Sequence, residues 1–246
     1  MVHLSQTSKV FRNILFRLFV GVSMLWPVAS QGQYVIEALP RWMISGHVYA
    51  MFPQPPVSAY LDSDDWGFQF EAQYRLQYNR PFLAGLYYNE AILSEYAVEY
   101  IMYDPDGELE VKNKAKTNRI EAGLTAGFYP EINWLLQPYL QGRMGVAWYK
   151  TDVKIKDTED YEIIDRSNIM TESVLSYGLD IGIHVVPRIW YVRGDLRFGF
   201  VANPSVTFMS YDEEKSDMVG YPIDFFETHT SSAKWFKVSA GVTYMF

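Results

Sequence analysis

The chain has 246 residues and a formal net charge of -8, and 17% of its residues are aromatic. The acidic balance argues against nucleic-acid binding, which needs a basic surface. The absence of cysteine excludes disulfides, thiol catalysis and cysteine metal sites. Because the sequence has no run of 18 or more apolar residues, a membrane-spanning helix is not expected.

The first segment, residues 1–30, has the parts of a secretory signal peptide. Three basic residues precede a short apolar core at residues 18–26, and small residues follow it. We expect cleavage after Ser30, with cleavage after Gly32 as the alternative. An N-terminal membrane anchor is the less favoured interpretation, because the apolar core is short for a span. Residues 31–246 are then the mature domain.

The rest of the chain repeats one pattern, in which apolar and polar residues alternate with a period of two. This period predicts strands that have one apolar and one polar face. The pattern ends with an amphipathic segment whose last residue is Phe246. The pattern predicts eight strands, with ten as the alternative. An even number lets the first and last strands pair antiparallel and close the sheet. The eight predicted segments are 41–52, 66–78, 82–103, 107–128, 134–149, 173–186, 190–201 and 234–246.

The connections between these segments alternate in length. Short turns are expected at 79–81, 129–133 and 187–189, whereas the remaining connections are long and acidic. Short periplasmic turns and long outer loops are typical of outer-membrane barrels. The segments 82–103 and 107–128 exceed what a bilayer requires, so we expect their hairpin to project. The long connections are Pro53–Asp65, Thr151–Glu172 and Ala202–Ala233, together with a tip at Asp104–Gly107.

Two observations favour an apolar face that points outward, to lipid, rather than inward as in a soluble ligand carrier. Nine glycines share the polar parity, as the crowded interior of a narrow barrel requires. Indole rings lie near segment ends on the apolar parity, as in an interfacial girdle. The fold class is therefore all-β, a closed antiparallel up-and-down transmembrane β-barrel. The predicted girdle consists of Trp42, Trp66, Trp134, Trp148 and Trp190.

The alternation, the segment 137–142 (Gln-Pro-Tyr-Leu-Gln-Gly) and the terminal Phe246 resemble small bacterial outer-membrane β-barrels. The resemblance is to the OmpX/OmpA-like kind, particularly porin-family-like proteins of Bacteroidota. It implies an integral protein of a Gram-negative outer membrane, surrounded by lipids and lipopolysaccharide. It also implies that Phe246 is the signal read by the barrel-insertion machinery. Pro138 departs from a regular strand, so we expect it near the periplasmic rim or at a bulge.

An eight-stranded barrel has an interior that side chains just fill. Charges of both signs are predicted to point into it and should pair, because an unpaired buried charge is strongly destabilising. We expect a plug of ion pairs; a charged lining of a narrow pore is the alternative. The same alternation also places Glu95, Glu99 and His184 inward. The predicted lumen network is Glu71, Arg75, Arg119, Glu121, Arg143, Asp180, Arg193, Asp195 and Arg197.

The sequence has no GxSxG, HExxH or P-loop motif, and we expect no enzymatic activity, cofactor or metal site. Lipid A-modifying barrels use serine, histidine and carboxylate near the outer rim, and only His47, His184 and His229 are candidates here. The apolar loop segment Tyr221–Phe226 is a candidate contact for a protein partner. We expect a structural or recognition role, in assembly or through long acidic outer loops. A narrow porin for small solutes and a lipid A-modifying enzyme are the alternatives.

Overall fold

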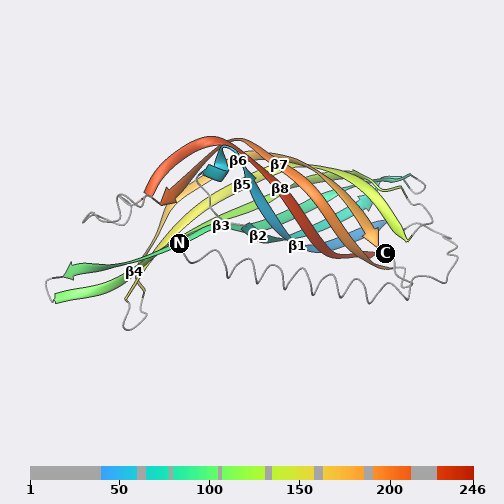
Figure 1. The fold of residues 1–246 in the computed structure, drawn as a ribbon. Helices are drawn as coiled ribbons and strands as arrows, with labels where there is room; N and C mark the ends of the chain where they lie inside the picture. The colour runs from blue at the N-terminus through green and yellow to red at the C-terminus, as the bar shows by residue number, and fades with distance from the viewer. Residues whose placement is uncertain are drawn as a thin grey trace.

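The computed structural model describes residues 40–59, 65–77, 80–104, 107–130, 135–157, 163–185, 191–211 and 226–246. Each strand pairs antiparallel with the next, and β8 returns to β1, so the predicted eight-stranded closed barrel is confirmed (Figure 1). None of the helical segments in these ranges is long and apolar enough to cross a membrane. The elements are β1 Trp42–Gln54, the 3-10 turn η2 Val57–Ala59, β2 Asp65–Arg75, β3 Phe82–Asp104, β4 Gly107–Phe128, β5 Leu136–Asp157, β6 Ile163–Val185, β7 Val192–Tyr211 and β8 Phe226–Met245.

The barrel wall has its apolar face outside and its polar face inside. Leu124, Ile181 and Val242 are 60%, 58% and 55% exposed. On the opposite face, Gln69 and Glu71 are buried. A soluble barrel would bury the first three side chains, because apolar surface is driven out of water. The predicted outward apolar face is therefore confirmed.

Glycine marks the crowded side of the wall. A Cβ added at any of the three outward glycines, Gly46, Gly142 and Gly194, would meet no atom nearer than 3.5 Å. At the nine glycines of the polar face, an added Cβ would come within 2.6 Å of an existing atom. Real Cβ atoms do not approach so closely, so a larger residue at any of these positions would force a neighbouring atom to move. The nine are Gly67, Gly85, Gly123, Gly127, Gly145, Gly178, Gly182, Gly199 and Gly241.

The two ends of the barrel differ. The turn end holds the connections that follow β2, β4 and β6, together with the first residue of β1 and the end of the chain. There, the Trp42 N–H donates to the Phe246 carbonyl at 2.8 Å, and the Phe246 N–H donates to the Trp42 carbonyl at 3.0 Å. The loop end holds the connections after β1, β3, β5 and β7. At the loop end the β3–β4 hairpin extends far past β1 and β2 (Figure 1).

The strands at the loop end are longer than the sequence predicted. The projecting β3–β4 hairpin is confirmed, but the loops predicted at Thr151–Glu172 and Ala202–Ala233 are wrong in extent. β5 continues to Asp157 and β6 starts at Ile163, while β7 continues to Tyr211 and β8 starts at Phe226. The prediction required apolar residues on the outward face, and beyond Trp148 the outward residues of β5 are charged: Lys150, Asp152, Lys154 and Lys156.

Along β4 and β5, the polar and apolar residues exchange faces in the part of each strand that projects. On β4 the outward residues are apolar from Ile120 to Phe128, and on β5 they are apolar from Leu136 to Trp148. These stretches of nine and thirteen residues bracket the roughly 9–11 residues that a tilted strand needs to cross a bilayer. Beyond them the outward positions become charged, and buried apolar residues take the inward face. The buried inward residues there include Val111, Ala115 and Val153, and the outward ones include Lys114, Lys116 and Lys154.

A bulge in β3 corrects the predicted orientation of Glu95 and Glu99. The β3–β4 register shifts between Ile92 and Ser94, so one extra residue enters β3 at Leu93. The later described side chains of β3, those of Glu95, Ala97 and Glu99, therefore lie on the other face. Glu95 and Glu99 point outward and pair with lysines of β4 instead of lining the lumen.

The wall is discontinuous between β6 and β7. Their backbone pairing ends at Tyr177 and Ala202, although both strands continue beyond these residues. Above that point a side chain spans the gap: Asn203 Nδ2 donates to the Leu175 carbonyl at 2.8 Å. This part of the wall depends on side chains rather than on a backbone ladder.

Candidate functional site

The interior of the barrel is the most distinctive site in the described part of the chain. Its side chains come from all eight strands, since alternate residues of each strand must point inward. Four acids and four bases with recorded ion pairs lie there in three layers, so their formal charges balance. The acids are Glu71, Glu121, Asp180 and Asp195, and the bases are Arg119, Arg143, Arg197 and Lys237.

The layer nearest the turn end is organised by Arg197. Its Nη1 lies 2.8 Å from Glu71 Oε2, and its Nη2 lies 2.7 Å from Asp195 Oδ2. Asp195 also accepts a hydrogen bond from the Tyr139 hydroxyl at 2.6 Å. His47 Nε2 lies 2.8 Å from the same carboxylate. Arg197 is fully buried, so this guanidinium is held entirely by protein groups.

The middle layer is looser. Asp180 lies 3.6 Å from Arg143 Nη2 and 3.8 Å from Lys237 Nζ, which exceeds hydrogen-bonding distance. Lys237 Nζ instead donates to Gln69 Oε1 at 2.5 Å. All of these groups are buried, so their charges are compensated within the barrel.

In the layer nearest the loop end, charged side chains contact aromatic side chains. Arg119 Nη2 lies 2.7 Å from Glu121 Oε2, and Arg119 Nε donates to the Tyr149 hydroxyl at 3.1 Å. The guanidinium carbon lies 5.4 Å from the centre of the Trp235 ring, within the range of a cation–π interaction. Glu121 also accepts a hydrogen bond from the Tyr87 hydroxyl at 2.7 Å.

Apolar clusters cover the polar interior at both ends, which the sequence analysis did not predict. The turn-end cluster comprises Met43, Leu83, Tyr129, Tyr139 and Met245. The larger loop-end cluster is built around Trp235 and includes Val57 from η2. Its buried members are Tyr49, Met51, Val57, Ala91, Leu93, Ala147, Tyr149, Val201, Val206, Ala233 and Trp235.

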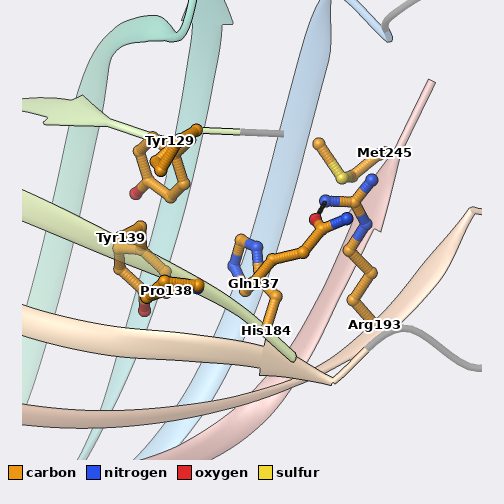
Figure 2. A pocket seen from close by; sticks show the side chains of 8 residues that line it. Tyr129, Gln137, Pro138, Tyr139, His184, Arg193 and Met245 are labelled. Carbon is orange, nitrogen blue, oxygen red and sulfur yellow. Dashed lines mark hydrogen bonds between the residues drawn. The ribbon is translucent and has the colours of Figure 1, made fainter. Parts of the chain in front are cut away.

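A small cavity opens at the turn end. Figure 2 shows Gln137 and Arg193 joined across it, with Arg193 Nη1 donating to Gln137 Oε1 at 2.7 Å. The stacked rings of Tyr129 and Tyr139 lie on its other side, with centroids 4.6 Å apart. The volume of about 10 Å³ is that of about one water molecule. The cavity is therefore too small for an organic substrate.

All nine predicted lumen residues are buried inside the barrel. Seven of them join the three layers, and the other two, Arg75 and Arg193, lie at the turn end. Arg75 donates to the carbonyls of Pro40 and Arg80, at 3.1 and 2.9 Å, and closes the turn after β2. Lys237 was missed as a network member, although it shares the polar parity of β8 with Ser239 and Thr243. The parity signal that would have identified it was present in the sequence.

Of the predicted girdle, Trp42, Trp66 and Trp148 lie on the outer face and are 46%, 59% and 38% exposed. Trp134 and Trp190 fall outside the described residues, as do the predicted signal peptide and residues 221–225 of the predicted partner loop. Phe246 lies directly after β8, on the outer face at the turn end.

Three histidines fall within the described residues, and two of them lie beside the same carboxylate. His47 and His184 both approach Asp195, at 2.8 and 3.5 Å, deep in the interior. The nearby Ser45 donates to Glu71 rather than to a histidine. His229 lies on β8, 4.0 Å from Glu227. A nucleophile needs a base within hydrogen-bonding reach and a path for substrate. His47 is buried, and His184 lines the cavity at the turn end, which is too small for an organic substrate.

No protein-family model matches the sequence, and a search of curated proteins found no match. Among solved structures, the chain is similar to Neisserial surface protein A, with 12% identity, a TM-score of 0.45, and coverage of 83% of this chain and 97% of that one. It is also similar to a major outer membrane protein from Thermus thermophilus, with 14% identity, a TM-score of 0.47, and coverage of 83% and 99%. A third similar structure is the outer membrane protease OmpT from Escherichia coli, with 10% identity, a TM-score of 0.37, and coverage of 88% and 99%.

These likenesses concern the fold alone, and they agree with the predicted resemblance to small outer-membrane barrels. One of these structures is a protease by its title, whereas the others carry no activity in theirs. A shared fold does not fix activity, which depends on the site. The narrower resemblance to Bacteroidota proteins stays a prediction.

Proposed function

We propose that this chain is an integral outer-membrane barrel that does not conduct, and that its projecting loop end serves recognition or assembly at the cell exterior. The observation that carries the proposal is the combination of an apolar outer wall with a filled interior, in which three layers pair four acids with four bases. An apolar band of bilayer height has no function in water but is required in lipid. A lumen filled by ion pairs serves stability rather than passage.

The filled interior favours a plug over the alternative of a narrow porin. Three ion-paired layers and two apolar clusters follow one another along the axis. A hydrated solute would have to displace groups that are hydrogen-bonded and buried, such as Arg197 and Arg119. Removing a partner from a buried charge costs several kcal/mol, about 3–5 for a broken pair.

The recognition role is supported by the length of the strands at the loop end. β3 to β6 have 22 or 23 residues each, about twice what a crossing needs. Such an extension has no use for anchoring in lipid, because the apolar band is already complete below it. Its function therefore lies in what it presents to the exterior.

Planar-bilayer recording of the purified, refolded chain tests the proposal. We expect no conductance steps above the bare bilayer, while an open porin measured in the same chamber gives them. Regular steps would favour the narrow porin. Folding is checked separately by the slower or faster migration of unheated protein on SDS gels, and localisation by fractionation of the cell envelope. The mass of the mature chain tests the expected cleavage after Ser30.

The lipid A-modifying enzyme is tested independently. Mass spectra of lipid A from cells with and without the protein should be identical, because His47 and His184 are buried in the interior of the barrel, out of contact with lipid. A mass shift that depends on the protein would overturn this. Deleting residues 221–226 and comparing co-purifying proteins tests the partner loop.

A further inference from the structure

Lysines gather on one part of the outer wall. Six of the ten lysines in the chain point outward from β4 and β5, directly beyond the apolar band. The chain as a whole is acidic, with a net charge of -8, so composition does not explain the gathering. We name this surface the lysine strip: Lys112, Lys114 and Lys116 on β4, and Lys150, Lys154 and Lys156 on β5.

The register of β4 and β5 places lysines directly opposite lysines. Lys112 lies opposite Lys156, and Lys114 lies opposite Lys154. Like charges directly opposite on neighbouring strands destabilise the pair. The sheet alone gains nothing from this arrangement, whereas a bound anion would relieve the repulsion.

Acidic side chains compensate only part of the strip. Lys112 pairs with Glu99 at 2.7 Å, Lys114 with Glu95 at 2.6 Å, and Lys150 with Asp152 at 3.1 Å. Within the described part of the chain, no ion pair involves the other three lysines. Lys116 lies opposite Glu95 and Asp152, but these two carboxylates pair with Lys114 and Lys150. Lys116, Lys154 and Lys156 are therefore available to an anion from outside the protein.

The height of the strip identifies the kind of anion. Lys150 follows Trp148, the last apolar outward residue of β5, by two positions, and Lys156 follows it by eight. At about 3.3 Å per residue and a tilt of about 45°, the strip covers roughly 5 to 19 Å above the apolar band. The head-group region of an ordinary phospholipid is only about 5–8 Å deep on each side. The upper lysines thus stand above it, at the level of sugars.

We infer that the lysine strip binds the phosphate groups of an outer-leaflet phosphoglycolipid, whose anionic groups are spread over a sugar head group. Lysine suits this ligand, because its ammonium is a point charge on a flexible stem and can follow a mobile phosphate. The inference rests on the proposed function, since it requires the loop end to face the outer leaflet. It adds a binding surface and a ligand class to that function.

The experiment measures binding by the full mature chain, folded in neutral detergent at low ionic strength. Lipopolysaccharide in the same detergent is titrated against it and followed by thermophoresis. Chemically dephosphorylated lipopolysaccharide and inorganic phosphate are the second and third ligands. The strip variant is K116Q/K154Q/K156Q. The control is R41Q/R80Q, which removes two exposed positive charges at the turn end, at the opposite end of the barrel from the strip.

We expect the strip variant to bind intact lipopolysaccharide on the order of tenfold or more weakly, because each surface lysine near anionic lipid contributes about fivefold. The control should stay within about twofold of the parent, and added salt should reduce the difference. Equal losses in both variants, or equal affinity for dephosphorylated lipopolysaccharide, would overturn the inference. Inorganic phosphate that binds the strip as well as the glycolipid does would overturn the glycolipid assignment.

The two proposals fail in different ways. Both variants must first show the heat-dependent gel migration of a folded barrel. A parent protein that folds in detergent but never enters bilayers contradicts the proposed membrane function. A parent protein that enters bilayers and shows no preference for phosphorylated glycolipid contradicts the lysine strip alone.

Discussion

Asn203 Nδ2 donates a hydrogen bond of 2.8 Å to the carbonyl of Leu175, where the backbone ladder between β6 and β7 has already ended. The same side chain accepts from the Tyr149 hydroxyl at 2.9 Å, through Oδ1. The side-chain nitrogen and oxygen of Asn203 are thus both hydrogen-bonded within the barrel wall. One side chain joins a third strand, β5, to the edge of a gap between two others.

Replacing Asn203 with alanine should loosen this part of the wall. The change leaves the Leu175 carbonyl and the Tyr149 hydroxyl short of a partner, at a cost of about 1–3 kcal/mol. Urea unfolding in lipid vesicles, followed by tryptophan fluorescence, measures the loss. Hydrogen exchange should quicken at residues 172–176 of β6 and not in β4. The control Asn168→Ala removes an exposed amide on β6 and should change stability by less than about 0.5 kcal/mol. Unchanged exchange in β6 would show that the bridge is dispensable.

Arg197 is expected to be the most sensitive charge in the interior. Arg197→Met leaves both Glu71 and Asp195 buried without their principal cation, which should cost about 3–5 kcal/mol. Lys112→Met breaks an exposed pair with Glu99 and should cost less than about 1 kcal/mol. Both are measured by the same unfolding titration. Neutralising the acids as well, in R197M/E71Q/D195N, should recover part of the loss; no recovery would place the effect in packing rather than charge.

Gly123 should be nearly irreplaceable. A Cβ at this position would lie 2.3 Å from the Met144 carbonyl oxygen and 2.5 Å from the Gly145 Cα, both backbone atoms of the paired strand. Gly123→Ala must therefore push β4 and β5 apart, and we expect little or no folded barrel. The fraction of heat-modifiable protein on SDS gels after refolding is the measurement. Gly142→Ala, whose nearest atom would be 3.9 Å away on the outer face, should refold like the parent. Similar yields for both would contradict the crowding argument.

The bulge at Leu93 can be tested by cysteine labelling, because the chain has no cysteine of its own. Ala91 and Glu95 share sequence parity, yet the bulge places Ala91 inside and Glu95 outside. A membrane-impermeant maleimide added to intact cells should label Glu95→Cys and leave Ala91→Cys unlabelled. Labelling of Glu95→Cys only after the cells are permeabilised would mean that the loop end faces the periplasm. If neither cysteine is labelled, even after the cells are permeabilised, the strand has no bulge and Glu95 faces the interior.

Much of the fold could be predicted because lipid imposes a strict rule on each strand. Segments such as 66–78 and 236–244 alternate without error, since every second residue must meet hydrocarbon. Strand number, closure, the outward apolar face and the inward glycines all follow from that rule. The same rule also explains the errors. Beyond the apolar band, where the outward residues need not meet hydrocarbon, Thr151–Glu172 has no continuous apolar face that would predict its strands.

Two other features could not be predicted from the local sequence pattern. Leu93 looks like any apolar strand residue, and nothing in its neighbours indicates that it is inserted as a bulge, so Glu95 and Glu99 were assigned to the wrong side. The apolar clusters at the two ends of the interior depend on how inward residues from several strands meet. Met43, Leu83 and Met245 are far apart in sequence, and only closure of the barrel brings them together.

The unequal strand lengths give the barrel a slanted rim. β1 and β2 have 13 and 11 residues, whereas β3 and β4 have 23 and 22. At about 3.3 Å per residue, the β3–β4 tip stands tens of ångströms farther along the strands than the β1–β2 connection does. An antibody or another cell would meet that tip before any other described part of the chain, while a molecule diffusing in the lipid would touch only the low side. Foreign peptides meant for display belong between Asp104 and Gly107, where they would be held clear of the surrounding sugars.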